Sequence, residues 1–201
     1  MLTRALLKYG VALVLGGTTS PSNAEAQWFI AADVSADRFW GGSIERGPER
    51  RSFRPYRPTT LGLGVNHRSG AVEVGLKLGY TGASLALEGN DAVVAVKGVF
   101  TIYSLSPELS YRLTAAGGEN TVRLHVGPLF ELWGLQHETS RGRVGVQGAV
   151  SLDLSFGGRI GASIGGGVAL TSSPFDAVQL SGYELRALWR RRFGLGLQYR
   201  L

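Results

Sequence analysis

The last residues of the chain, 183–201, alternate between two kinds of side chain almost without a break. Since successive side chains of a β-strand point to opposite faces, this pattern predicts one long strand. One face would carry Leu185, Ala187, Trp189, Phe193, Leu195, Leu197, Tyr199 and Leu201, and the other Glu184, Arg186, Arg190, Arg192, Gly194, Gly196, Gln198 and Arg200. A strand of this length, ending on an aromatic and a final hydrophobic residue, is uncommon in a soluble domain and typical of the closing strand of a membrane barrel.

Residues 1–26 have the parts of a secretory signal peptide. After a basic start, the apolar run over 9–17 is too short to cross a bilayer as a helix; the alternative, an N-terminal anchor helix, would need about 20 apolar residues. Ala24-Glu25-Ala26 matches an A-x-A cleavage site, so we expect cleavage before Gln27 and one mature domain over 27–201. The chain has no cysteine, which excludes a disulfide scaffold and a lipidated cysteine.

Composition favours a sheet protein with a lipid partner. Thirty glycines and a charged fraction of 18% suit a sheet with close packing on one face. The formal net charge is +6 at pH 7, yet no basic stripe follows a helical period, and an exported chain rarely meets nucleic acid. The basic excess therefore indicates anionic lipid head groups, and not nucleic acid, as the partner.

Turn signals divide the rest of the chain into eight alternating segments. The predicted strands are 28–43, 59–68, 71–83, 98–113, 121–135, 143–155, 159–170 and 183–201. Short connections at 69–70, 115–120 and 156–158 alternate with longer polar ones at 44–58, 84–97, 136–142 and 171–182. Turns on one side of a membrane and surface loops on the other give this order. It predicts an all-β fold, an eight-stranded antiparallel up-and-down transmembrane β-barrel.

Residue size indicates which face of the predicted barrel points outward. Glycines crowd the polar face, as at Gly75, Gly79 and Gly165, whereas bulky residues crowd the apolar face. An eight-stranded barrel has an interior only just wide enough for side chains, so the small-residue face must be the concave one. This favours an apolar wall facing lipid over the alternative, a soluble barrel of the lipocalin type with its apolar face inside.

Outward-facing aromatic residues are expected in two bands, one near each edge of the apolar wall. The lower band comprises Trp28, Tyr111, Phe156 and Tyr199, and the upper band Tyr80, Tyr103, Phe130 and Trp189. The bands lie roughly nine residues apart, or ~23 Å along the membrane normal, which is close to the ~25 Å apolar band of outer-membrane barrels.

Three stretches carry a resemblance to a known family. They are the run over 103–113 with Pro107 in it, the run over 121–135 with Gly127-Pro128, and the closing residues 196–201, which end on Leu201 rather than Phe. Together they resemble the small eight-stranded outer-membrane barrels of the OmpA, OmpX and opacity-protein type. The resemblance implies a bacterial outer-membrane location, a monomer, and insertion by the barrel-insertion machinery. It leaves the function open, because such barrels include structural proteins, adhesins and a few lipid-modifying enzymes.

Charges on the inward face are expected to pair with one another at matching heights, because buried charges need partners. The predicted lumen ion pairs are Glu73 with Arg112, Lys77 with Glu108, and Asp37 with Arg192. A lumen filled in this way would leave no aqueous channel. We interpret these residues as structural and not as catalytic.

The sequence gives little support for an enzyme or a cofactor. Lipid A deacylases resemble this architecture and use a His and a Ser two residues apart, a spacing that His67-Arg68-Ser69 matches. This motif falls at a periplasmic turn, on the wrong side for lipid A. Three isolated histidines without cysteine make no metal site, and no glycine cluster forms a dinucleotide or phosphate loop. We expect no catalytic residues, cofactor or metal.

The first long connection is rich in arginine, with two aromatic residues interleaved. The candidate residues for binding an anionic lipid or glycan are Arg46, Arg50, Arg51, Arg54 and Arg57. Guanidinium groups bind phosphate in a bidentate fork, and lipopolysaccharide presents phosphates at that height. The alternative is a solvated loop, partly neutralised by Glu45 and Glu49.

These observations predict a non-enzymatic outer-membrane barrel that serves envelope structure or surface interaction, with lipopolysaccharide bound at its first surface loop. Two alternatives stay open at this point, a lipid A-modifying enzyme and a narrow channel.

Overall fold

The computed structural model describes residues 26–46, 51–88, 93–116, 120–135, 140–175 and 182–201. The predicted signal peptide lies outside the described residues except for Ala26. In the described part of the chain, no helix is long and apolar enough to cross a membrane.

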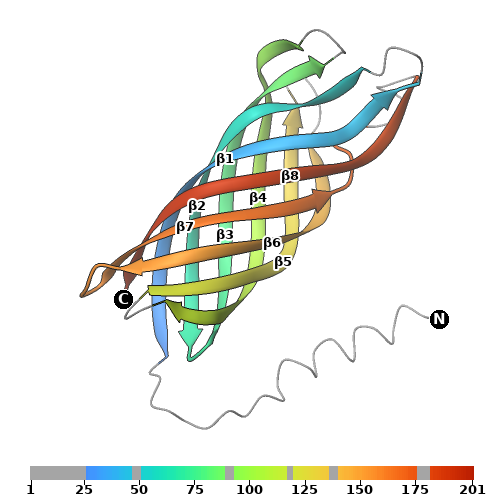
Figure 1. Ribbon diagram of the computed structural model, residues 1–201. Helices are drawn as coiled ribbons and strands as arrows, with labels where there is room; N and C mark the ends of the chain where they lie inside the picture. Colours follow the sequence, from blue (N-terminus) through green and yellow to red (C-terminus); the bar gives the residue numbers. More distant parts are fainter. Residues whose placement is uncertain (1–25, 47–50, 89–92, 117–119, 136–139, 176–181) are drawn as a thin grey trace, which may run out of the picture.

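Eight antiparallel strands form a closed barrel in which every strand pairs with its neighbours in sequence and β1 pairs with β8 (Figure 1). The strands are β1 (Gln27–Glu45), β2 (Ser52–Ser69), β3 (Val72–Glu88), β4 (Val93–Ala116), β5 (Asn120–Leu135), β6 (Arg141–Ser155), β7 (Ile160–Thr171) and β8 (Tyr183–Arg200). The predicted fold class is confirmed. We call the end that holds the short connections the turn end and the opposite one the loop end.

The strands reach further toward the loop end than the sequence predicted. The β3–β4 ladder continues through Leu85–Val96 and Leu87–Val94, and β2 begins at Ser52 instead of at 59. Much of the polar sequence expected in the first two long connections is therefore strand. Backbone pairing continues there because each strand still has a neighbour to hydrogen-bond, whether or not lipid surrounds it.

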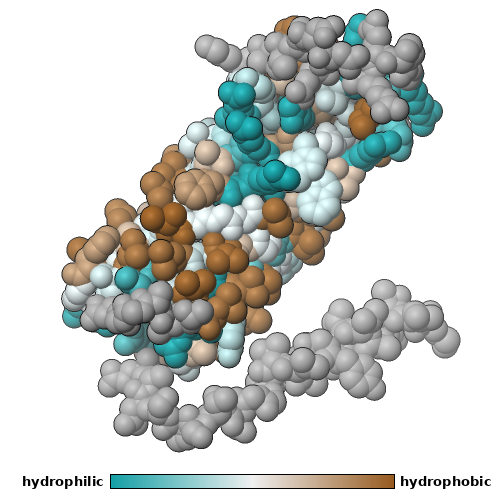
Figure 2. Space-filling model, viewed as in Figure 1, coloured by the Kyte–Doolittle hydropathy of each residue, from teal (hydrophilic) through white to brown (hydrophobic). Residues whose placement is uncertain are grey.

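The outer wall is apolar, as the size argument predicted. Residues of both predicted aromatic bands point outward, with exposed fractions from 40% for Trp189 to 65% for Phe156. Between them lie exposed aliphatic side chains such as Leu63 (63%) and Leu197 (62%). Figure 2 shows hydrophobic residues gathered over the turn-end half of this view and hydrophilic residues toward the loop end. A wall of this kind is unfavourable in water and favourable in hydrocarbon.

The loop-end part of the lumen contains a hydrophobic cluster that the sequence analysis did not predict. It consists of Phe39, Ala83, Phe100, Ile102, Trp133, Phe175 and Leu188, all buried. Trp133 meets Phe39 and Phe100 edge to face, with ring centroids 6.1 and 5.8 Å apart. Edge-to-face packing of buried rings adds to the stabilisation from burial itself.

One prediction for the closing strand is wrong at its loop end. The pairing of β1 with β8 shifts register between Gly41 and Ser43, so the alternation of β8 is interrupted there. As a result Leu188 is buried in the lumen, and Leu185 packs against the hydrophobic cluster. Arg186, expected inside, is exposed and pairs with Glu184 at 3.0 Å. Gly41 and Gly42 have φ of +85° and +89°, a conformation that a side chain would strain.

Candidate functional site: the lumen and the outer rim

The lowest layer of lumen charges lies near the turn end. Arg123 is 2% exposed, and its Nε donates to Asp153 Oδ2 at 3.1 Å. Arg68 Nε donates to Glu73 Oε2 at 2.6 Å, and its Nη2 lies 3.5 Å from Asp153 Oδ2. These two arginines and two carboxylates form one charge-paired group, as buried charges require.

The predicted pair of Glu73 with Arg112 is absent. Arg112 is exposed at the turn end of β4, where the β4–β5 register shifts between Arg112 and Thr114. Glu73 is 4% exposed and instead pairs with Arg68, its direct partner across the tight turn between β2 and β3. The expected connection at 69–70 would have placed Glu73 opposite Asn66, whereas the structure turns at 70–71 and places Glu73 opposite Arg68.

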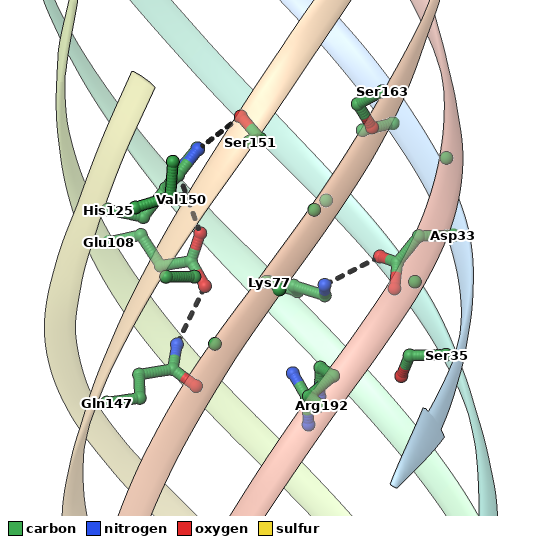
Figure 3. A pocket seen from close by; sticks show the side chains of 18 of the residues that line it. Asp33, Ser35, Lys77, Glu108, His125, Gln147, Val150, Ser151, Ser163 and Arg192 are labelled. Carbon is green, nitrogen blue, oxygen red and sulfur yellow. Dashed lines mark hydrogen bonds and ion pairs between the residues drawn. The ribbon is translucent and has the colours of Figure 1, made fainter. Parts of the chain in front are cut away.

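The middle of the lumen holds a cavity of about 160 Å³, lined by charged and polar side chains together with small and aliphatic residues (Figure 3). On one side, Lys77 Nζ lies 2.7 Å from Asp33 Oδ1. The two residues belong to β3 and β1 and meet over Gly62 of the intervening strand. A Cβ on Gly62 would collide with the Asp33 carboxylate and with Lys77 Cε, so this pair depends on the glycine.

Lys77 and Glu108, predicted to pair, lie on different walls of the cavity (Figure 3). Glu108 Oε1 accepts a hydrogen bond from Gln147 Nε2 at 2.7 Å. His125 lies beside it, with Nδ1 3.9 Å from Glu108 Oε2 and 2.9 Å from Ser110 Oγ. His125 Nε2 shares a further hydrogen bond of 2.8 Å with Ser151 Oγ. Both ring nitrogens are thus engaged with serines inside the lumen.

The third layer lies below the hydrophobic cluster and contains the predicted pair of Asp37 with Arg192. Arg192 Nε donates to Asp37 Oδ1 at 3.2 Å, and Thr60 Oγ1 donates to Asp37 Oδ2 at 2.8 Å. Arg190 forms an ion pair of 2.8 Å with Glu131, which also accepts a hydrogen bond of 3.0 Å from Trp133 Nε1. The indole thereby joins the charged layer to the cluster above it.

In the described part of the chain, His67 and Ser69 of the His67-Arg68-Ser69 motif form no hydrogen bond with each other. His67 lies at the turn end, where its ring packs against Trp28 with centroids 4.7 Å apart. Ser69 is exposed at the same turn. The described residues include no group of three His, Asp or Glu side chains that could hold a metal ion.

The arginines of the first connection do not share one environment. Arg46, Arg51 and Arg57 are exposed, with Arg51 Nε 3.9 Å from Glu45 and Arg57 over the Tyr56 ring at 5.2 Å. Arg50 lies outside the described residues.

Arg54, expected in the first surface loop among the residues that bind an anionic lipid or glycan, lies in a strand instead. It is part of β2, opposite the fully buried Ala86, and its Nη1 donates to the Phe39 carbonyl at 2.6 Å. This hydrogen bond links β2 to β1 on the lumen side. Arg54 faces the lumen because β2 begins earlier than expected and includes it.

Comparisons with known proteins identify the fold. No protein-family model and no curated protein sequence matches the chain. Among solved structures, Neisserial surface protein A is similar with a TM-score of 0.58 and 8% identity, over 88% of this chain and 99% of that one.

Two further solved structures are similar to the chain over most of its length. The outer membrane protein AlkL matches with a TM-score of 0.55 and 12% identity, over 92% of this chain and 94% of that one. The outer membrane protein OprG from Pseudomonas aeruginosa matches with a TM-score of 0.51 and 12% identity, over 89% of this chain and 96% of that one. The fold is that of the small eight-stranded outer-membrane β-barrels.

The lumen contacts predict which charges are energetically coupled. In a double-mutant cycle, the effects of Asp33→Ala and Lys77→Ala on stability should be coupled by about 0.5–3 kcal/mol. Either single replacement would leave the remaining charge without its partner. The measurement is the free energy of unfolding in detergent or lipid. The matched control is the cycle of Lys77→Ala with Glu108→Ala, whose effects should add. Additive effects for Asp33 and Lys77 would contradict the pairing.

Proposed function

We propose that the protein spans the bacterial outer membrane as a monomeric, non-enzymatic barrel that serves envelope structure or surface interaction. The observation that carries this proposal is the inversion of the usual burial pattern. Charged residues such as Asp37 and Arg123 are buried, whereas aliphatic residues such as Leu63 and Leu197 are exposed all around the wall. In lipid this arrangement removes apolar surface from water, and closure of the barrel leaves no unpaired edge strand.

Because its lumen is filled, the protein is better explained as a barrel without a pore than as a channel. The charged layers around Arg123 and Arg190 and the hydrophobic cluster around Trp133 bound the cavity at its two ends. Small eight-stranded barrels have just enough interior volume for such side chains. His125 is held between two serines in this interior, which supports a structural role for it.

The exposed arginines at the rim support contact with an anionic surface glycolipid. Arg46, Arg51 and Arg57 lie at the loop end, above the apolar wall, where lipopolysaccharide would present phosphates. Arg54 is not among these proposed glycolipid-binding residues, because its side chain faces inward.

The membrane assignment predicts the behaviour of the purified protein. Unheated protein should migrate faster than boiled protein on a detergent gel, because a closed barrel resists unfolding by detergent. After insertion into planar bilayers it should give no steady single-channel current, since the lumen is filled. Identical mobility before and after boiling would contradict the membrane barrel, and a stable current would contradict the closed lumen.

The rim assignment predicts separate effects for exposed and inward arginines. The triple variant Arg46→Gln, Arg51→Gln, Arg57→Gln should retain several-fold less lipopolysaccharide and lose less than about 1 kcal/mol of stability. Arg54→Gln is the matched control, and it should instead lower the free energy of unfolding by about 1–3 kcal/mol. Unchanged lipopolysaccharide retention in the triple variant would contradict this assignment and indicate that the rim arginines are only solvated.

A further inference from the structure

Two arginines on the outer wall lie directly opposite each other at the seam that closes the barrel. Arg38 of β1 is the register partner of Arg191 of β8, and both side chains are exposed. The next outward pair toward the loop end is Trp40 with Trp189, whose rings are stacked at 6.0 Å with an angle of 10°. In Figure 2, hydrophilic atoms over the middle of β1 and β8 border the hydrophobic part of the wall.

These two arginines lack a counter-charge within the described part of the chain. Neither forms an ion pair there with a carboxylate, and like charges directly opposite in a sheet are destabilising. Arg191 is also fixed in place, because its Cζ lies 4.7 Å from the centre of the Trp40 ring. Two arginines directly opposite each other on paired strands, one of them against an aromatic ring, are suited to an oxyanion with several acceptor oxygens, of which phosphate is the best match.

A groove of about 680 Å³ lies beside the two arginines on the same wall. Apart from the two arginines, its outward lining is small or aliphatic at Ala36, Leu124, Gly148, Val150, Gly166 and Val168, and aromatic at Phe193. Packing within the barrel does not require the outward-facing glycines that line the groove. A Cβ on Gly166 would meet Arg192 O at 3.6 Å and Phe193 Cδ2 at 4.0 Å, which are ordinary contacts, whereas a Cβ on the inward Gly167 would collide with Ala149.

The groove runs away from the arginines toward the turn end. Ala36 of β1 pairs with Phe193, Phe193 with Gly166, Gly166 with Val150, and Val150 with Leu124, so the groove crosses five strands. Leu124 is near the turn end of β5, which begins at Asn120, whereas Arg191 lies about midway along β8. A ligand bound here would hold an anionic group near the upper aromatic band and an apolar chain deeper in the wall.

We propose that Arg38 and Arg191 bind a phosphate of lipid A, and that one acyl chain of this lipid occupies the groove. The inference rests on the proposed outer-membrane location, which places the loop end of the wall in the leaflet that contains lipid A. It differs from the rim contact above, since it lies on the lipid-facing wall and needs an acyl chain as well as a phosphate.

The test uses full-length mature protein in phosphatidylcholine vesicles that contain a small fraction of lipid A. Lipid A bound to the protein is measured by mass spectrometry after gentle extraction. Each guanidinium removed should weaken binding about tenfold, so Arg38→Gln with Arg191→Gln should weaken it on the order of a hundredfold. The charge-matched control is Arg112→Gln with Arg159→Gln at the turn end, which should bind as the wild type does.

A second variant tests the acyl chain. Gly166→Leu fills the groove without touching either arginine, and it should reduce lipid A binding while leaving binding of the deacylated phosphorylated disaccharide unchanged. Val144→Leu, on the outer wall away from the groove, is its control. Insertion of the wild type and of every variant is checked by heat-modifiable mobility, and failure of the wild type to insert would count against the membrane barrel itself. Inserted variants that bind lipid A like the wild type would overturn this inference alone.

Discussion

Closure of the β1–β8 seam into a barrel of eight strands determines which side chains of the described strands can point inward. The seam pairs β1 with β8 from Phe29–Arg200 at one end to Glu45–Tyr183 at the other. Because the closed barrel has a narrow lumen, the bulky apolar residues within the apolar belt point outward, and small or mutually paired residues fill the lumen there. The ion pairs, the inward glycines and the apolar wall all follow from this one constraint.

The same constraint explains what could be predicted from the sequence. The alternation over 183–201 and the regular change of short and long connections were enough to predict the strands and the outward face. The pair of Asp37 with Arg192 was also accessible, because these residues are direct register partners across the seam. Heights counted along neighbouring strands failed for Lys77, whose partner Asp33 is two strands away and reachable only over Gly62. A narrow lumen lets side chains meet across an intervening glycine, and counting along adjacent strands does not detect this.

The loop end was the least predictable part. Its inward positions carry rings, such as Phe39, Phe100 and Trp133, where the turn-end half carries charges. The expectation of a polar lumen therefore held only for the part of the barrel inside the apolar belt. The register shift beside Gly42 exchanges the faces of β8 there, and the early start of β2 turns Arg54 inward. Bulges and strand ends depend on tertiary pairing, which local alternation does not encode.

The central claim is that the apolar face of each strand contacts lipid while the opposite face is enclosed. The chain contains no cysteine, so single cysteines along β3 can each carry a nitroxide label in bilayers. The account predicts high accessibility to oxygen, which concentrates in lipid, for labels at Val74, Leu76 and Leu78. It predicts low accessibility for labels at Glu73 and Lys77, giving a period of two residues. Labels at all five positions that are equally accessible to a water-soluble nickel complex would contradict the account.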